Sequence, residues 1–459
     1  MEPTVYSPDL IYCDGRFVSG TGLLVDATGK IEKLVPMNAG ATAKAVPMPG
    51  KALLPGLVNG HSHSFQRLIR GRAETRGASG NNFWTWRDTM YRAAKALDAD
   101  QVYDVARMTF LEMALAGITA VGEFHYLHKK PDGAAYDDPN ELAKKVIAAA
   151  KSVGLRICLL RVAYLRAGYK LEPNPGQMRF YETLPEYMEN TAALARGIAG
   201  QDRVSMGVAP HSVRAVPLDA LKEIVQWAEE RQLPLHMHAA EQRAENAACG
   251  AEYGVTPVQL LARNGLLTER STLVHAIHIT PDERDAIAGA GAMICSCPTT
   301  ERNLGDGIVD AEAAIAKGIG FCFGSDSQAT IDLLEDAREL DCHLRLVREQ
   351  RVILDGVAGV DISQRLLGYA TAGGAKSLGL NAGELKPGAH ADFFTVDLND
   401  VSIAGAAAGE LTGAVVFGMD RAAVRDVVVG GERIVSGGRH GLQEEIVRKY
   451  GEVSAKVWR

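Results

Sequence analysis

The sequence lacks the features of a membrane or exported protein. It contains no run of about 18 apolar residues, which a helix needs to cross a bilayer, and no basic and apolar signal segment at its N-terminus. It also lacks an excess of basic residues, because 49 Lys and Arg stand against 56 Asp and Glu and give a net charge of −7. Broad nucleic-acid binding needs a basic face, so we expect neither nucleic acid nor a membrane as a partner. A small anionic substrate held by a few arginines remains compatible with this charge.

Paired cysteines are also lacking. Seven cysteines are scattered along the chain, and no Cys-x-x-Cys pair occurs among them. An odd, dispersed set predicts reduced thiols and a cytoplasmic protein. Cys295 and Cys297 flank Ser296 in an apolar run, where we expect them to pack in the core.

What is present is an ordinary globular composition with a strong internal pattern. The chain has 459 residues, 47% hydrophobic and 23% charged, which suits one large domain and one small one. Short apolar runs alternate with amphipathic stretches, as buried parallel strands alternate with helices. Eight such runs occur: 57–58, 118–124, 157–163, 204–209, 233–238, 272–277, 292–295 and 319–323.

Eight strand–helix units predict a (β/α)₈ TIM barrel of the α/β class over residues 56–384. The structural alternative is an open doubly wound sheet. We favour the barrel because polar residues follow many different strands, and do not gather at one switch point. The two chain ends, 1–55 and 385–459, carry short strand candidates punctuated by Gly and Asp, including 414–416, and we expect them to build one composite β-sandwich domain.

The most informative motif follows the first barrel strand. Residues 54–63 read Leu-Pro-Gly-Leu-Val-Asn-Gly-His-Ser-His, which places His61 and His63 two residues apart. Side chains at i and i+2 of a strand point the same way, so both imidazoles can converge on one point. Two neutral imidazoles on one point are suited to a divalent metal such as Zn²⁺.

Further candidate ligands follow other strands. His238 ends the fifth strand candidate, His275 lies in the sixth, and Asp326 follows the eighth. In a closed barrel these strand ends face one mouth, and strands one and eight are neighbours. His61, His63, His238 and Asp326 can then surround one metal and leave a position for water.

The chain resembles the amidohydrolase superfamily over nearly its whole length. The shared segments are Pro55–His63, His238-x-x-Glu241, His275, Gly324-Ser325-Asp326, Gly373–Gly379 and the Gly383–Asp392 return into the β domain. Members with two metals usually carry a modified lysine after strand four, but residues 206–211 read Met-Gly-Val-Ala-Pro-His. The resemblance therefore implies the deaminase branch with one Zn²⁺ per subunit, or Fe²⁺, on His61, His63, His238 and Asp326. His236 is expected to be structural.

The resemblance also implies a hydrolytic mechanism. A bound metal lowers the pKa of water toward neutrality. Asp326 is the expected base, His275 the group that hydrogen-bonds the hydroxide or the oxyanion, and Glu241 the proton shuttle to the departing nitrogen. An amidine carbon fits this arrangement, since its cationic nitrogens pair with Glu241.

The expected substrate is a small dianionic amidine, N-formimino-L-glutamate. The segment 82–91, Asn-Phe-Trp-Thr-Trp-Arg-Asp-Thr-Met-Tyr, and the Pro210–Arg214 segment are similar to members that hydrolyse it. Two carboxylates suit arginines, which bind them through paired N–H donors. The implied contacts are Gln66, Arg87, Tyr126, His211 and Arg214.

Several alternatives stay open. An aminoheterocycle deaminase acting on guanine or S-adenosylhomocysteine is the alternative enzyme, and a family member that lost its metal is the non-catalytic one. Either ammonia or formamide can follow attack on the formimino carbon. A homodimer is expected by analogy.

Some residues near the strand ends have no assigned role or depart from the family pattern. His125 and His128 match no ligand position, Ser325 is expected to orient Asp326 or touch substrate, and Gln328 stands where a histidine is expected. The basic run Arg67, Arg70, Arg72 and Arg76 is interpreted as a solvated loop that can attract a dianion.

Overall fold

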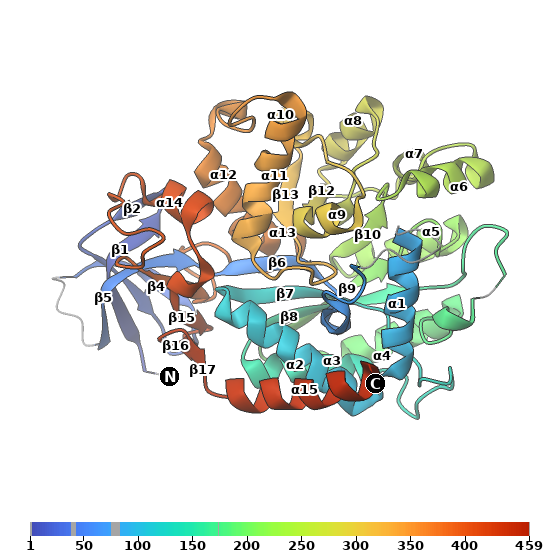
Figure 1. Cartoon of the computed structure of the whole chain (residues 1–459), viewed down its shortest axis with the longest axis horizontal. Helices are drawn as coiled ribbons and strands as arrows, with labels where there is room; N and C mark the ends of the chain where they lie inside the picture. Colours follow the sequence, from blue (N-terminus) through green and yellow to red (C-terminus); the bar gives the residue numbers. More distant parts are fainter. Residues whose placement is uncertain (1, 38–42, 75–82, 173, 459) are drawn as a thin grey trace.

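A parallel eight-stranded barrel forms the centre of the molecule (Figure 1). The structure is a computed structural model that describes residues 2–37, 43–74, 83–172 and 174–458. The strands follow one another around the sheet in chain order, and a bridge between Ser62 and Asp326 joins the first strand to the loop after the last. They are β6 (Leu57–Ser62), β7 (Ile118–His125), β8 (Arg156–Ala163), β9 (Val204–Pro210), β10 (Leu235–Ala239), β11 (Ser271–His275), β12 (Met293–Ser296) and β13 (Gly320–Phe323). The predicted barrel and its eight strands are confirmed.

The barrel strands are buried on both faces, as their nearly continuous apolar character predicts. Every residue of β6, β7 and β8 is buried. Parallel strands covered by helices need this pattern, because no face meets water. Consequently any ionisable side chain on these strands is buried as well, and the strand ends are where such side chains meet the mouth.

Helices surround the barrel and connect its strands. The one with the clearest sequence signal is α2, where Asp98 and Gln101 form a reciprocal N-terminal cap and Gly117 adopts a φ of 84° just beyond the helix end. The helices of the barrel region are α1 (Phe83–Ala96), α2 (Ala99–Leu115), α3 (Glu141–Val153), α4 (Leu184–Ile198), α5 (Leu218–Glu230), α6 (Arg243–Tyr253), α7 (Pro257–Arg263), α8 (Pro281–Ala290), α9 (Pro298–Leu304), α10 (Ala311–Ala316), α11 (Leu333–Arg348), α12 (Ile362–Gly368) and α13 (Gly374–Ser377), with short turns η1 (Ser64–Ile69), η2 (Pro175–Gln177), η3 (Val357–Gly359) and η4 (Tyr369–Gly373).

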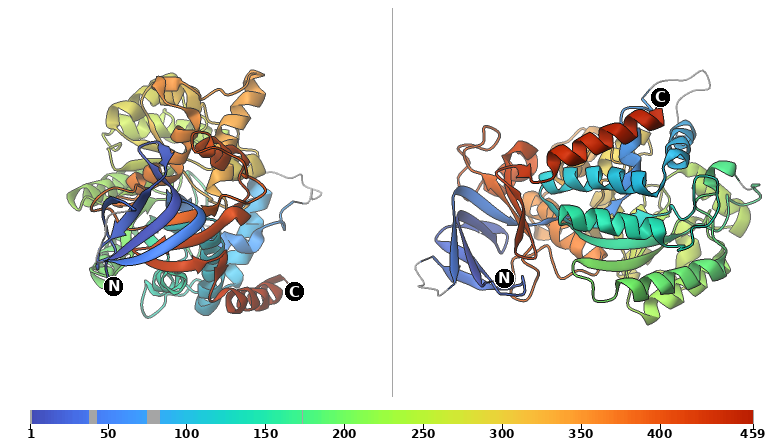
Figure 2. Two further views of the ribbon diagram at one scale, coloured as in Figure 1. Left: turned by 90° about the vertical axis from the view of Figure 1, so that its left-hand side faces the viewer. Right: turned by 90° about the horizontal axis from the view of Figure 1, so that it is seen from below.

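Both chain ends build a second, mixed sheet of nine strands beside the barrel. Strand β5 pairs parallel to β1 on one side and antiparallel to β14 on the other, so the N-terminal and C-terminal segments share one sheet. The sheet curls around its own core, which includes Ile11, Leu53 and Phe393 (Figure 2). Its strands are β1 (Thr4–Cys13), β2 (Arg16–Val18), β3 (Thr21–Val25), β4 (Ile31–Pro36), β5 (Lys44–Pro55), β14 (Phe393–Asp397), β15 (Val424–Val429), β16 (Glu432–Ser436) and β17 (Arg439–His440).

One expectation for the chain ends requires correction, and one strand was not predicted. Residues 414–416, expected as a strand, lie inside helix α14 (Leu411–Gly418), which packs on α11 and α12. A short apolar run does not distinguish a strand from a buried helix, and here packing against two helices decides. Strand β5 was not anticipated, because prolines at positions 47, 49 and 55 interrupt its pattern.

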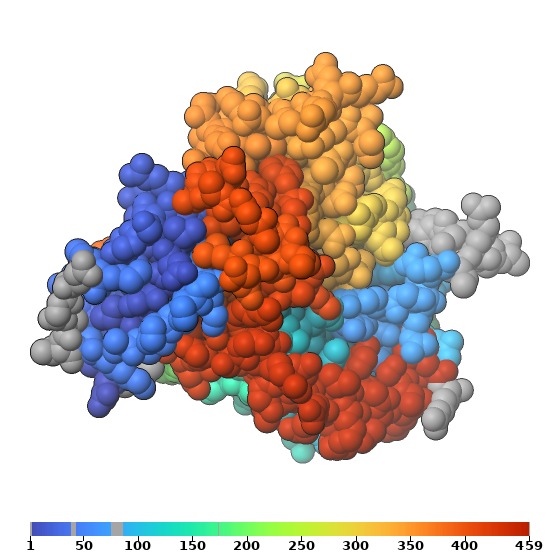
Figure 3. Space-filling view, turned by 60° about the vertical axis from the view of Figure 1, so that its left-hand side comes forward, coloured from blue at the N-terminus to red at the C-terminus, as the bar shows by residue number. Residues whose placement is uncertain are grey.

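The last helix, α15 (Gln443–Trp458), leaves the β domain and lies along α2 of the barrel (Figure 2). The space-filling view shows the C-terminal segment running over the surface from the N-terminal strands toward α1 (Figure 3). Arg107 of α2 pairs with Glu445, and Trp458 donates a hydrogen bond to the Leu68 carbonyl in η1. The C-terminus thus braces the turn that follows the His-x-His motif. Among the described helices, none is long and apolar enough to cross a membrane.

Candidate active site

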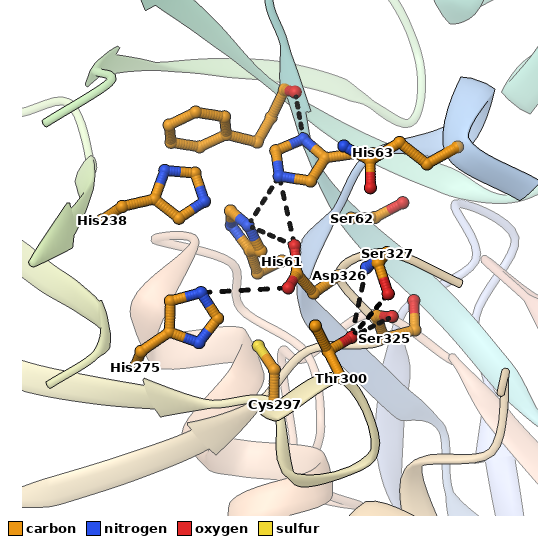
Figure 4. A network of polar contacts seen from close by, with 12 residues as sticks. His61, Ser62, His63, His238, His275, Cys297, Thr300, Ser325, Asp326 and Ser327 are labelled. Carbon is orange, nitrogen blue, oxygen red and sulfur yellow. Dashed lines mark hydrogen bonds and ion pairs between the residues drawn. The ribbon is translucent and has the colours of Figure 1, made fainter. Parts of the chain in front are cut away.

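Four side chains from three strand ends converge at the mouth of the barrel (Figure 4). Ligand atoms of His61, His63, His238 and Asp326 all lie within 4.8 Å of one another, and all four residues are buried. The Nε2 atoms of His61 and His63 are 3.2 Å apart, and Asp326 Oδ1 lies 3.3 and 3.2 Å from them. The structure thus brings together the four predicted metal ligands.

The donor set fits a divalent metal. His63 donates its Nδ1 hydrogen to the Phe124 carbonyl at 3.0 Å, and His238 donates its own to the His211 carbonyl at 3.1 Å. Each bond leaves the Nε2 lone pair directed into the site, which is how proteins fix a metal-binding tautomer. Burial lowers the pKa of His61 to about 3, so that imidazole stays neutral. The Nε2 atoms of His61 and His63 are close enough to bind one cation together.

The backbone locks the acidic ligand to the first strand. The Asp326 amide donates to the His61 carbonyl, and the His63 amide donates to the Asp326 carbonyl, both at 3.0 Å. Asp326 has a φ of 43° and His275 a φ of 72°, in a region that non-glycine residues rarely adopt. Such strain persists where the surroundings impose it, and it is common at functional sites.

A buried polar network supports this loop from below. Gln328 donates from Nε2 to the Asp326 carbonyl at 2.8 Å and to Ser62 Oγ at 3.0 Å. Ser62 in turn donates to Glu123 Oε2 at 2.7 Å, and Ser325 receives a hydrogen bond from Asn59 at 2.7 Å. Gln328 and Ser325 are fully buried and lie outside the cavity wall, so they support Asp326 from beneath.

Two further titratable groups face the metal ligands. His275 Nε2 lies 3.8 Å from Glu241 Oε1 and 3.8 Å from Asp326 Oδ2, while its Nδ1 lies 3.3 Å from Glu301. Burial acts to lower the pKa of His275, but the carboxylates of Glu241 and its other neighbours outweigh it and raise this pKa to about 10. Burial raises the pKa of Glu241. A donor and a proton carrier therefore stand side by side next to the candidate metal position.

A cavity of about 550 Å³ opens above these groups. All the predicted site residues line it except His61, which is fully buried beneath. Sequence reasoning missed Tyr164, Phe180 and Leu304, which also line the wall. Tyr164 follows its strand as Tyr126 follows the preceding one, so the same signal could have identified it. Phe180 and Leu304 lie in segments with no comparable pattern.

The lining of the cavity includes two guanidinium groups. The Arg87 guanidinium lies 5.4 Å from the Tyr91 ring centre, and Arg214 comes from the loop after β9. The buried Nε of Arg214 has no hydrogen-bond partner among the described residues, so it is a donor available to an anionic ligand. Gln66 donates to the Tyr126 hydroxyl at 2.7 Å, and its Oε1 is an acceptor with no described partner.

Hydrogen bonds from Arg166 fix the main chain at Arg214. Arg166 donates to the Arg214 carbonyl at 3.0 Å and to the Val213 carbonyl at 3.2 Å, and it forms a two-pronged ion pair with Glu252 of α6 at 2.7 Å. The same helix reaches the other side of the site, because Glu245 Oε2 accepts a hydrogen bond from the Glu241 amide at 3.2 Å. Helix α6 is thus linked to the Arg214 loop through Arg166 and contacts the Glu241 main chain directly.

Other singled-out residues lie elsewhere. His236 is buried with its Nε2 donating to the Ser377 carbonyl at 2.8 Å, as expected of a structural residue. His125 and His128 lie near Arg161.

The cysteines are free, as expected of reduced thiols. Cys295 and Cys297 pack in a small apolar cluster, and the Cys297 thiol lies within 4.8 Å of ligand atoms of His275 and Asp326. Arg67 and Arg70 turn away from the mouth, whereas Asn82 and Arg76 fall outside the described residues.

Comparison with known proteins agrees with this geometry. The profile described as the amidohydrolase family matches residues 52–434. The chain is 37% identical to a formimidoylglutamate deiminase of Pseudomonas aeruginosa over 94% of this chain and 95% of that one. It is 29% identical to a 5-methylthioadenosine/S-adenosylhomocysteine deaminase of Halobacterium salinarum over 86% and 83% of the two chains. A crystal structure of an amidohydrolase from Brucella melitensis superposes with a TM-score of 0.92 at 32% identity, covering 99% of this chain and all of that one.

Proposed function

The chain belongs to the amidohydrolase family, and we propose that it hydrolyses N-formimino-L-glutamate to N-formyl-L-glutamate and ammonia. The observation that carries the proposal is the shared lining of one cavity. The histidine and aspartate cluster, apart from His61, and the side chains of Arg87 and Arg214 all line it, and the buried Nε of Arg214 has no hydrogen-bond partner among the described residues. A linear amidine that bears two carboxylates matches both sets of residues, since its carboxylates pair with guanidinium groups while its formimino carbon faces the proposed metal ligands.

We propose one Zn²⁺ per chain, with Fe²⁺ as the alternative, held by His61, His63, His238 and Asp326. When bound there, the metal lowers the pKa of water so that hydroxide is available near neutral pH. The main-chain hydrogen bonds of His63 and His238 support this ligand set.

The chain's own residues move the protons. Asp326 accepts a proton from the attacking water as the new C–O bond forms at the formimino carbon. His275, anchored by Glu301, hydrogen-bonds the oxygen that becomes the formyl group. Glu241 takes the remaining hydroxyl proton of the adduct and transfers it to the formimino nitrogen, the C–N bond to that nitrogen breaks as the formyl C=O bond forms, and ammonia leaves. Gln66, Tyr126 and His211 supply further contacts to the substrate.

The test is nitrogen release from a panel of substrates. Ammonia formation is measured with N-formimino-L-glutamate, guanine, cytosine and S-adenosylhomocysteine, using the metal-loaded chain. We expect turnover of N-formimino-L-glutamate alone at a high rate, with ammonia and not formamide as the nitrogen product. Faster turnover of any ring substrate would overturn the proposal, and formamide would overturn the assigned bond cleavage.

A second candidate, an aminoheterocycle deaminase, is favoured by the aromatic lining. Trp86, Tyr91, Tyr126, Tyr164 and Phe180 all border the cavity and could stack on a purine. Arg214 in the same lining favours the dianion instead, because a neutral purine leaves the buried Nε donor of this arginine without a hydrogen-bond partner. The substrate panel separates the two candidates directly.

Three coarser features belong to the same proposal. We propose that residues 1–55 and 385–459 form the β domain and residues 56–384 the hydrolase domain; β5 ends at Pro55 and β6 begins at Leu57. A cytoplasmic location is supported by seven free cysteines. A homodimer is proposed by analogy with relatives and is tested by sedimentation of the metal-loaded chain.

A further inference from the structure

A second arginine cluster lies away from the mouth, between the barrel and the C-terminal elements. It borders a solvent-open cleft of about 1200 Å³, walled by η1, α2, β15 and α15 and by the turn η5 (Arg421–Ala423). Figure 1 shows α2, β15 and α15 meeting on this side of the molecule. The charged lining groups are Arg67, Arg70, Glu112, Asp420, Arg421 and Arg425.

One carboxylate is shared by three of these arginines. Glu112 lies 2.8 Å from Arg67 Nε, 2.7 Å from Arg70 Nη1 and 3.4 Å from Arg421 Nη1. The fourth, Arg425, pairs with Asp397 at 3.1 Å. Glu112 and Asp420 together carry one charge fewer than Arg67, Arg70 and Arg421, so the cleft carries an excess of positive charge that a small anion would balance.

Arg70 pairs with Glu112 but keeps one donor unused. Burial lowers its pKa even though Glu112 opposes this effect. Its Nη2 atom is buried and has no hydrogen-bond partner among the described residues. A partly buried guanidinium with an unused donor costs free energy, which a second anion beside Glu112 would reduce.

Arg70 also connects the cleft to the candidate active site. Its Nε donates to the Gln328 carbonyl at 2.5 Å. Gln328 has a φ of 63° and donates its side-chain amide to the Asp326 carbonyl at 2.8 Å. The cleft and the loop that carries Asp326 are therefore joined by two consecutive hydrogen bonds through one residue.

We propose that this cleft binds a compact oxyanion with at least two negative charges, of the phosphate or small dicarboxylate class. The bound anion balances Arg67, Arg70 and Arg421 and holds Arg70 against the Gln328 carbonyl. It thereby stabilises the loop that bears Asp326. The inference goes beyond the proposed function and does not depend on the identity of the substrate.

The test is calorimetric titration of the metal-loaded, full-length chain with inorganic phosphate and, separately, with succinate. We expect saturable binding of at least one of them, and the tighter ligand identifies the source class. Arg421 is half-exposed, and its replacement leaves the fold and the mouth untouched. We expect Arg421→Ala to weaken the affinity at least roughly fivefold, about 1 kcal/mol, and Arg421→Lys to retain most of it.

Two controls make the result decisive. Arg302→Ala removes a surface arginine that pairs with Glu335 and Glu339 elsewhere, and should leave binding unchanged. Arg214→Lys alters the mouth, and should also leave this site intact. Equal affinity in Arg421→Ala and the wild type, loss of binding only in Arg214→Lys, or no binding of either anion by the wild type would each overturn the proposal.

A second readout tests the connection to Asp326. The rate at which a chelator removes the metal is followed with and without the bound anion. We expect the anion to slow metal release in the wild type and to have no effect in Arg421→Ala. The same slowing in both proteins would overturn the coupling, because the anion would then act at the metal itself.

Discussion

Two buried polar clusters lie at the same end of the barrel and differ in how their members are satisfied. In the cluster behind β8, Arg161 is fully buried and donates to Glu182 at 2.7 and 2.8 Å and to Asn140 at 3.0 Å. In the mouth, the Nε2 atoms of His61 and His63 lie 3.2 Å apart, and Arg214 has a buried Nε without a partner among the described residues. The guanidinium of Arg161 therefore has its partners within the protein, whereas the mouth keeps an unused donor and a set of ligand atoms that suits a metal.

The difference separates structural from functional polar groups. A buried group that has its hydrogen-bond partners within the chain fixes the fold. A buried group without them costs free energy, so several such groups that line one cavity mark a candidate ligand site. Both clusters contain histidine, arginine and a carboxylate, so residue type alone would not distinguish them.

The largest expected effect on catalysis follows from Asp326→Asn. The amide cannot accept the proton of water, and it is a poorer metal ligand, so turnover should fall by roughly 10³-fold or more. Circular dichroism should show an intact fold. Asp332→Asn is the matched control, because asparagine also caps the start of α11 and should leave turnover unchanged. Retained activity in Asp326→Asn would contradict its role as base.

Next in size is Arg214→Lys. Lysine keeps the charge but loses the paired N–H donors, so kcat/KM for N-formimino-L-glutamate should fall roughly 10- to 100-fold, mainly through KM. Steady-state kinetics measure the change, with Arg302→Lys as the control on the surface. An unchanged KM would show that the mouth arginine does not bind a carboxylate.

A smaller effect is expected from Glu252→Gln. It removes one side of the Arg166 ion pair that holds the Arg214 carbonyl, so Arg214 is positioned less well. We expect KM to rise by about threefold, as about 0.6 kcal/mol would give, while kcat stays constant. Glu230→Gln, in an exposed pair with Arg231, is the control. A fall in kcat with KM constant would contradict a positioning role.

The smallest effect on catalysis, and a large one on stability, is expected from Glu182→Gln. Burial acts to raise the pKa of Glu182, but His128 and Arg161 outweigh it and hold this pKa at about 2. A depressed folded-state pKa stabilises the protein above the ordinary pKa of 4.5 and loses that contribution as the pH falls toward 2. Glu182→Gln should therefore lower the free energy of unfolding by about 3 kcal/mol at pH 7 and by less near pH 3.

Denaturant titrations at several pH values measure this change, and kcat at pH 7 should match the wild type. A constant stability difference between pH 7 and pH 3 would contradict the assigned ionisation of Glu182. A large fall in kcat would contradict the claim that the cluster around Arg161 is structural and the mouth is functional.

Much of the fold could be predicted from the sequence, because eight doubly buried strands leave eight short apolar runs. The His61 and His63 pair could be placed on one face because strand side chains alternate. Residues 414–416 could not be assigned to α14, since their apolar character suits either a strand or a buried helix.

The directions of loop side chains could not be predicted from the sequence. Arg67 and Arg70 follow the His-x-His motif closely, yet they turn to Glu112 on the far side of η1. Gln328 stands where the family resemblance implies a histidine at the mouth, and the structure places it in the buried layer beneath Asp326. Tertiary contacts decide such orientations, and spacing along the chain does not encode them.

The central claim is that the mouth recognises two carboxylates and an amidine together. Its most direct test is ammonia release by the metal-loaded chain from N-formimino-L-glutamate and from N-formimino-4-aminobutyrate, which lacks one carboxylate. We predict that kcat/KM for the second substrate is lower by roughly 10- to 100-fold, with S-adenosylhomocysteine lower still. Equal kcat/KM values for the two amidines, or a higher value for S-adenosylhomocysteine, would contradict the claim.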